Sequence, residues 1–310
     1  MKDLNTQPRV EIVILNYKGI HDTLALLENL CQIKYSNFSV ILIENASCDR
    51  SADKLQEIQH KYLDWRFIYN DKNLGFAGGC NQGIEIALKK NADYILLLNN
   101  DTLVENSFLA PLVELSKAHN AISGGLIQYG ELEKKKIWSY GGNLTWGAVP
   151  GHLHLFDSRV KPESLPENQK TDWILGCCML IPSNIIRKIG LIDEDYFAYV
   201  EDVDYCLRAN EAGFPSYVTS KSVIFHKVGQ ATGGGYSPKG RFLIAESSVV
   251  FNRKHADSIK RMKFIILFWI GIFVAGIREG LRGNLVSVKE KIAGYKSGWK
   301  KQLNQPRKIR

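Results

Sequence analysis

The fold is decided by one stretch of the chain, residues 94–101, which reads YILLLNND. Five apolar or aromatic residues in succession predict a buried β-strand. The strand ends abruptly at Asn99, Asn100 and Asp101, so polar side chains gather at its carboxyl end. In open α/β sheets, ligands bind beyond the carboxyl ends of the strands. This stretch therefore predicts a central strand and one wall of a binding site.

The residues before this stretch alternate between similar apolar runs and helical patterns. The apolar runs predict strands at residues 10–16, 39–44 and 66–69. Apolar residues at three- and four-residue steps predict helices at residues 20–33, 51–62 and 76–90. Strands that alternate with helices form parallel, doubly wound α/β sheets. The other strand ends then bring Asn16, residues 44–47 and residues 70–79 to the edge that Asp101 occupies.

The second half of the chain is less regular. Residues 130–170 are rich in Gly, Pro, aromatic and charged residues, which indicates an insertion with long loops. An apolar run predicts a strand at 172–181, and helical spacing predicts a helix at 201–212 that ends before Gly213. The remaining predictions are strands at 216–219 and 222–226, a mobile glycine-rich loop at 228–240 and a helix at 241–255.

Three acids stand within four residues at the start of the predicted helix, namely Glu201, Asp202 and Asp204. One acid in a first helical turn interacts favourably with the helix dipole, which is a purely structural explanation. Three acids also repel one another, and repulsion raises the pKa of a carboxyl toward the value that a general base needs. The helix dipole readily explains one of the three acids but not all of them. The cluster is therefore a candidate general-base site.

Asp101 and His226 are candidate metal ligands. A divalent cation that bridges a diphosphate needs hard oxygen ligands at a strand end, and Asp101 offers one beside Asn99 or Asn100. A plain Asx turn explains the same residues about equally well. His226 ends an apolar run, and a histidine considered alone is more often structural than a ligand.

Three glycines, Gly75, Gly78 and Gly79, open the predicted helix at 76–90. They allow an anion to approach the backbone closely at a helix N-terminus. Their spacing is not GxGxxG, so the loop alone is a weak indicator of phosphate binding. Walker A, HExxH, GxSxG and CxxC motifs are all absent from the sequence.

Taken in order, these segments resemble the family-two, GT-A-type glycosyltransferases, especially their bacterial rhamnosyltransferase-like members. The resemblance spans residues 9–255, and each motif alone is modest while their order is highly specific. It rests on His226 and on residues 13–19 (VILNYKG), 43–49 (IENASCD), 73–81 (NLGFAGGCN), 97–101 (LLNND), 190–199 (GLIDEDYFAY) and 201–208 (EDVDYCLR). It implies a Rossmann-like α/β fold of GT-A type, with a mostly parallel sheet and flanking helices.

The resemblance also implies a nucleotide-sugar donor and a divalent metal, Mg²⁺ or Mn²⁺. The base and ribose would be surrounded by Leu15, Asn16, Tyr17, Glu44 and Asn45. Asn73 and Gly75 would lie beside the nucleotide. The family's DxD-like signature corresponds to Asn99, Asn100 and Asp101. Asp101 would then hold the metal on the diphosphate, and His226 would be the second protein ligand.

By the same resemblance, Asp202 would be the catalytic base. Glu201 and Asp204 would keep it suitably basic or position the acceptor. The chain departs from the family at Glu44, where Asp is usual, and at Asn99, which replaces the first Asp of DxD. The second departure lowers the charge of the metal site, so the metal is expected to bind weakly without the diphosphate.

One base without a covalent nucleophile implies inversion at the anomeric carbon. The implied protein is an inverting hexosyltransferase of bacterial cell-surface polysaccharide synthesis, with a saccharide or polyprenyl-linked acceptor. The resemblance favours dTDP-linked rhamnose as donor, and UDP-linked hexoses stay open. A nucleotidyltransferase of similar layout is the first alternative, but it would need a glycine-rich, Lys- or Arg-bearing loop after the first strand, where residues 16–19 read NYKG.

The positive charge is concentrated in the last 53 residues. The whole chain has a net charge of +8, residues 1–257 sum to −3, and residues 258–310 sum to +11. The apolar run at 264–277 has 14 residues, whereas a membrane span needs about 20. A core helix or an interfacial or re-entrant segment fits better. The second alternative is a non-enzymatic protein whose basic tail binds nucleic acid. Basic residues beside an apolar segment favour binding to anionic lipid instead.

The sequence therefore predicts two parts, a catalytic domain at residues 1–257 and a membrane-associating helical tail at residues 258–310. Within the first part, residues 1–125 would bind the nucleotide and residues 126–257 the acceptor. The polar N-terminus, residues 1–9, lacks the apolar core of a signal peptide. The expected location is peripheral, on the cytoplasmic side of the plasma membrane.

Overall fold

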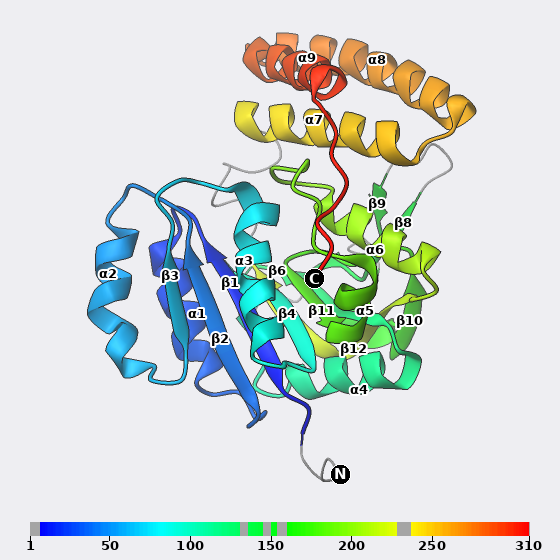
Figure 1. Ribbon diagram of the computed structural model, residues 1–310. Coiled ribbons are helices and arrows are strands. Elements are labelled where there is room, and N and C mark those ends of the chain that lie inside the picture. Colours follow the sequence, from blue (N-terminus) through cyan, green and yellow to red (C-terminus); the bar gives the residue numbers. More distant parts are fainter. Residues whose placement is uncertain (1–6, 131–135, 145–149, 154–159, 228–236, 310) are drawn as a thin grey trace.

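The computed structural model describes residues 7–130, 136–144, 150–153, 160–227 and 237–309. They form a ten-stranded sheet with flanking helices and a separate layer of three helices beyond the strand ends (Figure 1). The main strand order is β10-β12-β6-β11-β4-β1-β2-β3, with β5 paired to β12 and β7 paired to β6. The predicted α/β architecture is confirmed.

The first half follows the predicted alternation. Its strands are β1 (Val10–Asn16), β2 (Phe38–Glu44), β3 (Arg66–Tyr69) and β4 (Tyr94–Asn99). Its helices are α1 (Ile20–Leu30), α2 (Ser51–Ile58) and α3 (Gly75–Lys89), with the short 3-10 helix η1 (Gln59–Lys61). β1 lies between β2 and β4 and is parallel to both. Its apolar side chains are buried on both faces of the sheet, which is why these strands have continuous apolar runs.

The second half adds antiparallel pairs to the sheet. Its elements are β5 (Thr102–Val104), α4 (Leu109–His119), β6 (Ile122–Tyr129), β11 (Cys178–Pro182), α5 (Ser183–Ile189), α6 (Glu201–Glu211) and β12 (Ser216–His226). β11 runs antiparallel to β4 and to β6, and β12 is parallel to β6. This arrangement brings the ends of β4 and β12 to the same edge, because β5 joins them.

Two strand predictions in this half are corrected. The strand predicted at 172–181 begins only at Cys178, because residues 175–178 form a turn in which the Cys178 N–H donates to the Leu175 carbonyl (3.2 Å). The two short strands predicted at 216–219 and 222–226 are one strand, β12, whose register shifts between Thr219 and Val223.

The insertion predicted at 130–170 contains regular structure among its described residues. Its elements are β7 (Lys136–Ser139), β8 (Gly142–Leu144), β9 (Pro150–His152), η2 (Pro162–Ser164) and β10 (Asn168–Thr171). β8 and β9 form a small separate sheet, whereas β7 and β10 extend the main sheet. Most of the glycine-rich loop predicted at 228–240 lies outside the described residues.

The helical layer consists of α7 (Pro238–His255), α8 (Ser258–Leu281) and α9 (Leu285–Lys300). Val249 of α7 packs in one apolar cluster with Phe268 of α8 and Tyr295 of α9. Phe251 of α7 belongs instead to the large core around the sheet. The boundary predicted after residue 257 therefore follows a helix that both apolar cores share.

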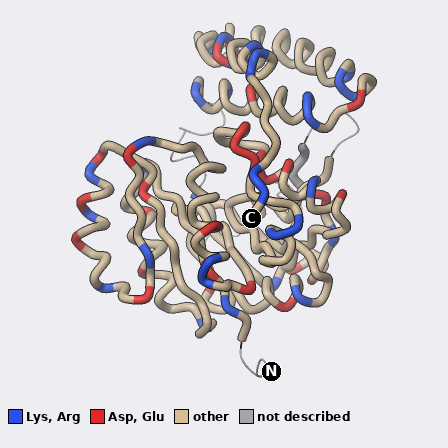
Figure 2. The backbone as a smooth tube through the Cα atoms, in the orientation of Figure 1, with Lys and Arg blue, Asp and Glu red and all other residues tan. Residues whose placement is uncertain are grey.

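α8 is 24 residues long, ten more than its apolar run. By length and composition it is the one helix in the described chain that could cross a membrane, and 22% of its most apolar window is buried. Its inner side, represented by Phe264 and Phe268, packs within the layer. Its outer side is exposed and apolar, with Phe273 70% exposed. Figure 2 shows little charge along the middle of this helix.

The chain returns to the body of the molecule, which contains the large sheet, after α9. The Asn304 N–H donates to Asp195 Oδ2 (2.7 Å), and the Leu191 N–H donates to the carbonyl of Arg307 (2.9 Å). The Arg307 guanidinium also pairs with Glu85 and Glu194. The helical layer is thus attached to the body at both of its ends.

Candidate active site

The predicted nucleotide side of the site is built from the ends of β1 and β2. Asn16 and Glu44 are buried, and the Asn16 amide donates to the Glu44 carboxylate. The Ser47 N–H donates to Glu44 Oε1 (2.6 Å) and its hydroxyl to Oε2 (3.0 Å). Thr23 Oγ1 donates to Asn16 Oδ1 (2.7 Å). The longer side chain of Glu44 is therefore held by neighbouring residues at the edge of the sheet.

Asn45 connects this network to the turn before α3. Its amide donates to Asn73 Oδ1 (3.0 Å) and to the Gly75 carbonyl (3.2 Å), and its own oxygen accepts from the Leu74 N–H (3.1 Å). Gly75 has φ +74°, and a Cβ there would lie 2.5 Å from the Phe197 carbonyl oxygen. Only glycine fits this approach, which brings the turn against the segment before α6.

Tyr17 lies between two cations. Lys18 Nζ and Lys239 Nζ are each 5.5 Å from the centre of its ring. Leu15, two residues earlier in β1, is partly exposed and contacts α3, where a Cβ on Gly79 would lie 2.4 Å from its side chain. The sequence analysis missed Lys239, because it is far along the chain. Its position within the glycine-rich loop predicted at 228–240 was the available signal.

Asp101 and His226 meet where β4 and β12 end. His226 Nε2 lies 2.9 Å from Asp101 Oδ1, and both side chains are buried. The edge of the His226 ring faces Trp138, with 4.9 Å between ring centres. Among the described residues, buried His226 Nδ1 has no hydrogen-bond partner. The structure therefore brings the two predicted metal ligands together.

Asn99 and Asn100 point in different directions from the same turn. The Asn99 amide nitrogen is 3.5 Å from His226 Nε2, beside the candidate ligand pair. The Asn100 amide donates instead to Thr23 Oγ1 (3.0 Å) and to the Gly19 carbonyl (3.3 Å). Asn100 thus connects the end of β4 to the start of α1.

Asp202 lies at the start of α6 and is connected to the end of β4 by two consecutive residues. The Gly176 N–H donates to Asp202 Oδ2 (2.9 Å), and the Asn99 N–H donates to the Cys177 carbonyl (3.0 Å). Burial raises the pKa of the Cys177 thiol, and the charges of nearby Cys178, Asp101 and Asp202 raise it further. Asp101 and Asp202 therefore lie on either side of one short turn.

The three acids of α6 have different environments. Burial raises the pKa of Asp202, although its carboxylate also accepts the Val203 N–H (2.8 Å). Burial, followed by the charge of Asp202, raises the pKa of Glu201 well above its usual range. Glu201 Oε2 is buried without a hydrogen-bond partner among the described residues. A carboxyl in this environment favours its neutral form.

Asp204 is part of an ion network behind the site. Its carboxylate lies 2.8 Å from Arg208 Nε and 2.7 Å from His255 Nε2 of α7, and it accepts the Tyr196 hydroxyl (3.2 Å). Burial alone would raise the pKa of Asp204, but the His255 hydrogen bond and the Arg208 charge lower it. Asp204 therefore joins α6 to α7.

The sequence analysis placed Ser47 at this edge of the sheet but did not identify the turn at residues 175–178 or Trp138 as parts of the region. The turn was missed because its residues continue an apolar run. Trp138 was missed because it belongs to the irregular insertion. The predicted strand end gave the position of Ser47 but not its hydrogen bonds to Glu44.

Comparisons with known proteins agree with this architecture. The model of the family described as glycosyl transferase family 2 matches residues 11–188, more than half of the chain. A solved mannosyltransferase, PcManGT from Pyrobaculum calidifontis in complex with GDP-Man and Mn²⁺, matches with a TM-score of 0.59 and 13% identity. The match covers 96% of this chain and 89% of that one. It shows a shared fold, and the GT-A-type prediction is confirmed.

Two curated relatives are similar over somewhat more than half of this chain. The low-salt glycan biosynthesis hexosyltransferase Agl10 of Haloferax volcanii is 27% identical over 64% of this chain. The N-acetylglucosaminyl-diphospho-decaprenol L-rhamnosyltransferase of Mycobacterium tuberculosis is 40% identical over 61% of this chain. The matches cover 61% and 66% of those relatives' own lengths.

Proposed function

This chain belongs to glycosyl transferase family 2, and from that premise we propose that it transfers a sugar from a nucleotide-diphosphate sugar, with inversion, to a saccharide or lipid-linked acceptor. The name of the 40% identical relative supports rhamnose as the sugar and a polyprenyl diphosphate-linked saccharide as the acceptor. The donor would then be dTDP- or UDP-linked, and the pathway would be the synthesis of a cell-surface polysaccharide.

One observation carries this proposal: a candidate ligand pair and a candidate base lie on either side of a single turn. Asp101 and His226 are 2.9 Å apart, and the Gly176–Cys177 peptides connect their strand end to Asp202. Group transfer from a nucleotide diphosphate needs charge compensation at the leaving group and a base for the attacking hydroxyl. The sheet edge offers both within one region.

The residues present fit a divalent metal such as Mg²⁺ or Mn²⁺. A carboxylate oxygen and an imidazole nitrogen converge, and both are common metal ligands. No group of three or more His, Cys, Asp or Glu side chains suited to a metal exists within the described ranges. The donor diphosphate and water would therefore complete the coordination. When bound, the metal would offset negative charge on the leaving diphosphate.

The chain's own residues would perform the remaining tasks. The buried Asn16–Glu44–Ser47 network would orient the ribose, and Tyr17 would lie against the nucleotide with Lys18 and Lys239 near its phosphates. Asp202 would accept the proton of the acceptor hydroxyl. Its two backbone donors fix the carboxylate while its raised pKa keeps it basic enough for that role.

We also propose that the protein lies on the cytoplasmic face of the plasma membrane. The exposed apolar side of α8 and the basic residues at its ends suit an anionic bilayer surface. A peripheral position there would bring the enzyme to an acceptor held by a lipid.

The test is a donor-hydrolysis panel with dTDP-rhamnose, UDP-hexoses and GDP-mannose, each with and without Mn²⁺ or Mg²⁺. We expect metal-dependent release of the nucleoside diphosphate from one donor class. Absence of binding and of turnover for every donor would refute the proposed activity.

A further inference from the structure

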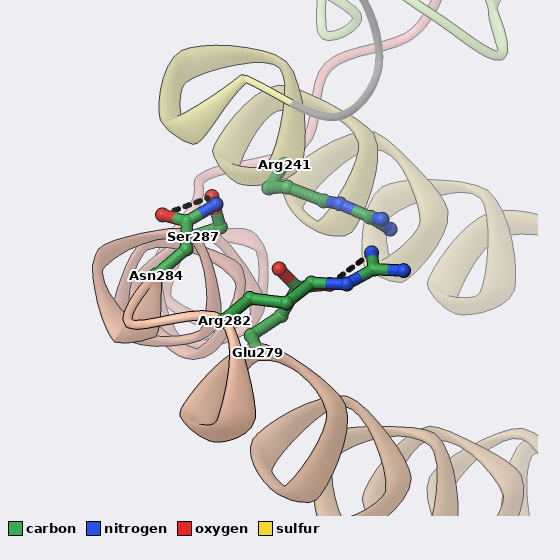
Figure 3. A pocket seen from close by; sticks show the side chains of 5 residues that line it. All are labelled: Arg241, Glu279, Arg282, Asn284 and Ser287. Atoms are coloured by element: carbon green, nitrogen blue, oxygen red, sulfur yellow. Dashed lines mark hydrogen bonds and ion pairs between the residues drawn. The ribbon is translucent and has the colours of Figure 1, made fainter.

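A cavity of about 360 Å³, lined by charged and polar residues, lies at one end of the helical layer, and none of the candidate active-site residues named above lines it. It is found where α7 and α9 begin and α8 ends. Figure 3 shows side chains from all three helices around it. The lining residues are Arg241, Glu279, Arg282, Asn284 and Ser287.

Cations outnumber acids around this cavity. Of the described residues, the one acid that lines it is Glu279, which is 2.7 Å from Arg278 and 3.9 Å from Arg282. Burial lowers the pKa of Lys291, and the charges of Arg241 and Arg278 lower it further. Two arginines thus pair with the one carboxylate, and Arg241 and Lys291 add positive charge to the same junction.

The donors in the cavity suit a phosphate group. The guanidinium groups of Arg241 and Arg282 extend toward the same side of the cavity in Figure 3. Guanidinium groups bind phosphate oxygens through paired N–H donors. Asn284 and Ser287 lie at the N-terminus of the 16-residue helix α9, where the helix dipole also favours an anion.

Exposed apolar side chains lie next to the lining residues along the chain. Leu281, directly before Arg282, is 86% exposed, and Val286 of α9, directly before Ser287, is 56% exposed. These apolar side chains would not stabilise the binding of a free anion. They would stabilise the binding of a lipid, because its acyl chains would contact them while its phosphate enters the cavity.

We propose that the cavity at the α7–α8–α9 junction binds the phosphate of an anionic membrane lipid, whose headgroup carries no cation of its own, through Arg241 and Arg282. The inference rests on the proposed membrane association and adds a defined site to it. Pairing of the two arginines with the phosphate would hold this end of the helical layer against the bilayer. The apolar face of α8 alone would determine only how deeply the helix enters the bilayer.

The experiment measures binding of the full chain to phosphatidylcholine vesicles with and without phosphatidylglycerol. The test variant is R241Q/R282Q. The matched control is K260Q/K263Q, which removes the same charge from the other end of α8. R241K/R282K keeps both charges but loses the guanidinium geometry, and the Tm of each variant reports its folding.

We expect R241Q/R282Q to lose about tenfold more affinity for phosphatidylglycerol vesicles than the control loses. R241K/R282K should lie between R241Q/R282Q and the intact chain. Equal losses in R241Q/R282Q and K260Q/K263Q would overturn the site, because all four cations would then act as general attraction.

Two further outcomes separate this inference from the proposed function. If the intact chain binds both vesicle types equally, the phosphate site is refuted but membrane association is not. If it binds neither vesicle type, the phosphate site and membrane association are both refuted. Inorganic phosphate serves as the free-anion probe. If it raises the Tm of the intact chain only, and R241Q/R282Q still binds vesicles normally, the cavity takes a free anion.

Discussion

Three carboxyl groups stand within four residues at the start of α6, yet each has a different environment. Asp202 accepts two backbone N–H groups, Glu201 Oε2 is buried without a partner among the described residues, and Asp204 pairs with Arg208 and His255. The sequence could show their clustering but not their directions. Those directions depend on the 175–178 turn and on α7, which are distant along the chain.

Asp202→Asn should abolish sugar transfer and leave donor binding nearly intact. The amide cannot accept a proton, and loss of a general base costs about 10²–10⁴-fold in rate. Turnover and donor Kd by calorimetry are the two measurements. Asp64→Asn, on the exposed surface of the body, is the control. Normal transfer by Asp202→Asn would remove this residue from the base role.

Glu201→Gln should change how stability depends on pH. Because the folded state raises the pKa of Glu201, the unfolded chain releases its proton first, at about 4.3. The free energy of unfolding therefore falls as the pH rises from this value to the pKa of Glu201 in the folded chain. The glutamine variant lacks this loss, so its Tm should exceed that of the intact chain near neutral pH and approach it in acid. Parallel Tm–pH curves would contradict the assignment.

At the scale of elements, local patterns predicted most of the first half, because β1 to β4 and α1 to α3 each bury a continuous or periodic apolar face. β5, α4 and β6 were not predicted. Pro111 interrupts the helical spacing of apolar residues in α4, and Gly124 and Gly125 interrupt the apolar run of β6. Tertiary contacts determine these elements, since Gly125 lies against β12 where a Cβ would be 2.4 Å from the Ser222 carbonyl.

The contact between α7 and α9 depends on small residues in α9. A Cβ on Gly294 would lie 2.1 Å from the Phe242 carbonyl oxygen. Gly294→Ala should therefore push the helices apart and cost about 1–3 kcal/mol of unfolding free energy. Gly276→Ala in α8 is the matched control, since no atom lies within 4 Å of its Cβ position. It should be neutral or stabilise by up to about 1 kcal/mol. Urea denaturation compares the two, and equal effects would refute the close approach.

At the scale of the whole molecule, the sequence separated an acidic body from a basic tail but could not show how they meet. The shared helix α7 and the return of residues 303–309 to the body are long-range contacts without local periodicity. The length of the apolar run also underestimated the length of α8, because the helix extends beyond that run at both ends.

Phe273→Gln combined with Ile277→Gln should weaken vesicle binding by at least about tenfold without unfolding the chain. Both side chains are more than half exposed, so their replacement removes apolar area from the outer side and leaves the core unchanged. Vesicle flotation measures binding and Tm measures folding. Leu63→Gln, 89% exposed on the body, should float normally. Flotation of the double variant at the level of the intact chain would exclude this face as the anchor.

The return of residues 304–307 to the body also sets an order of events during synthesis. Domains form from the N-terminus as the chain emerges from the ribosome. Here Asp195 and the residues around Leu191 gain their partners from a segment made after α8 and α9. The hydrophobic helix thus leaves the ribosome before the body is complete. Membrane contact would precede maturation of the enzyme, and newly made chains would finish folding where they act.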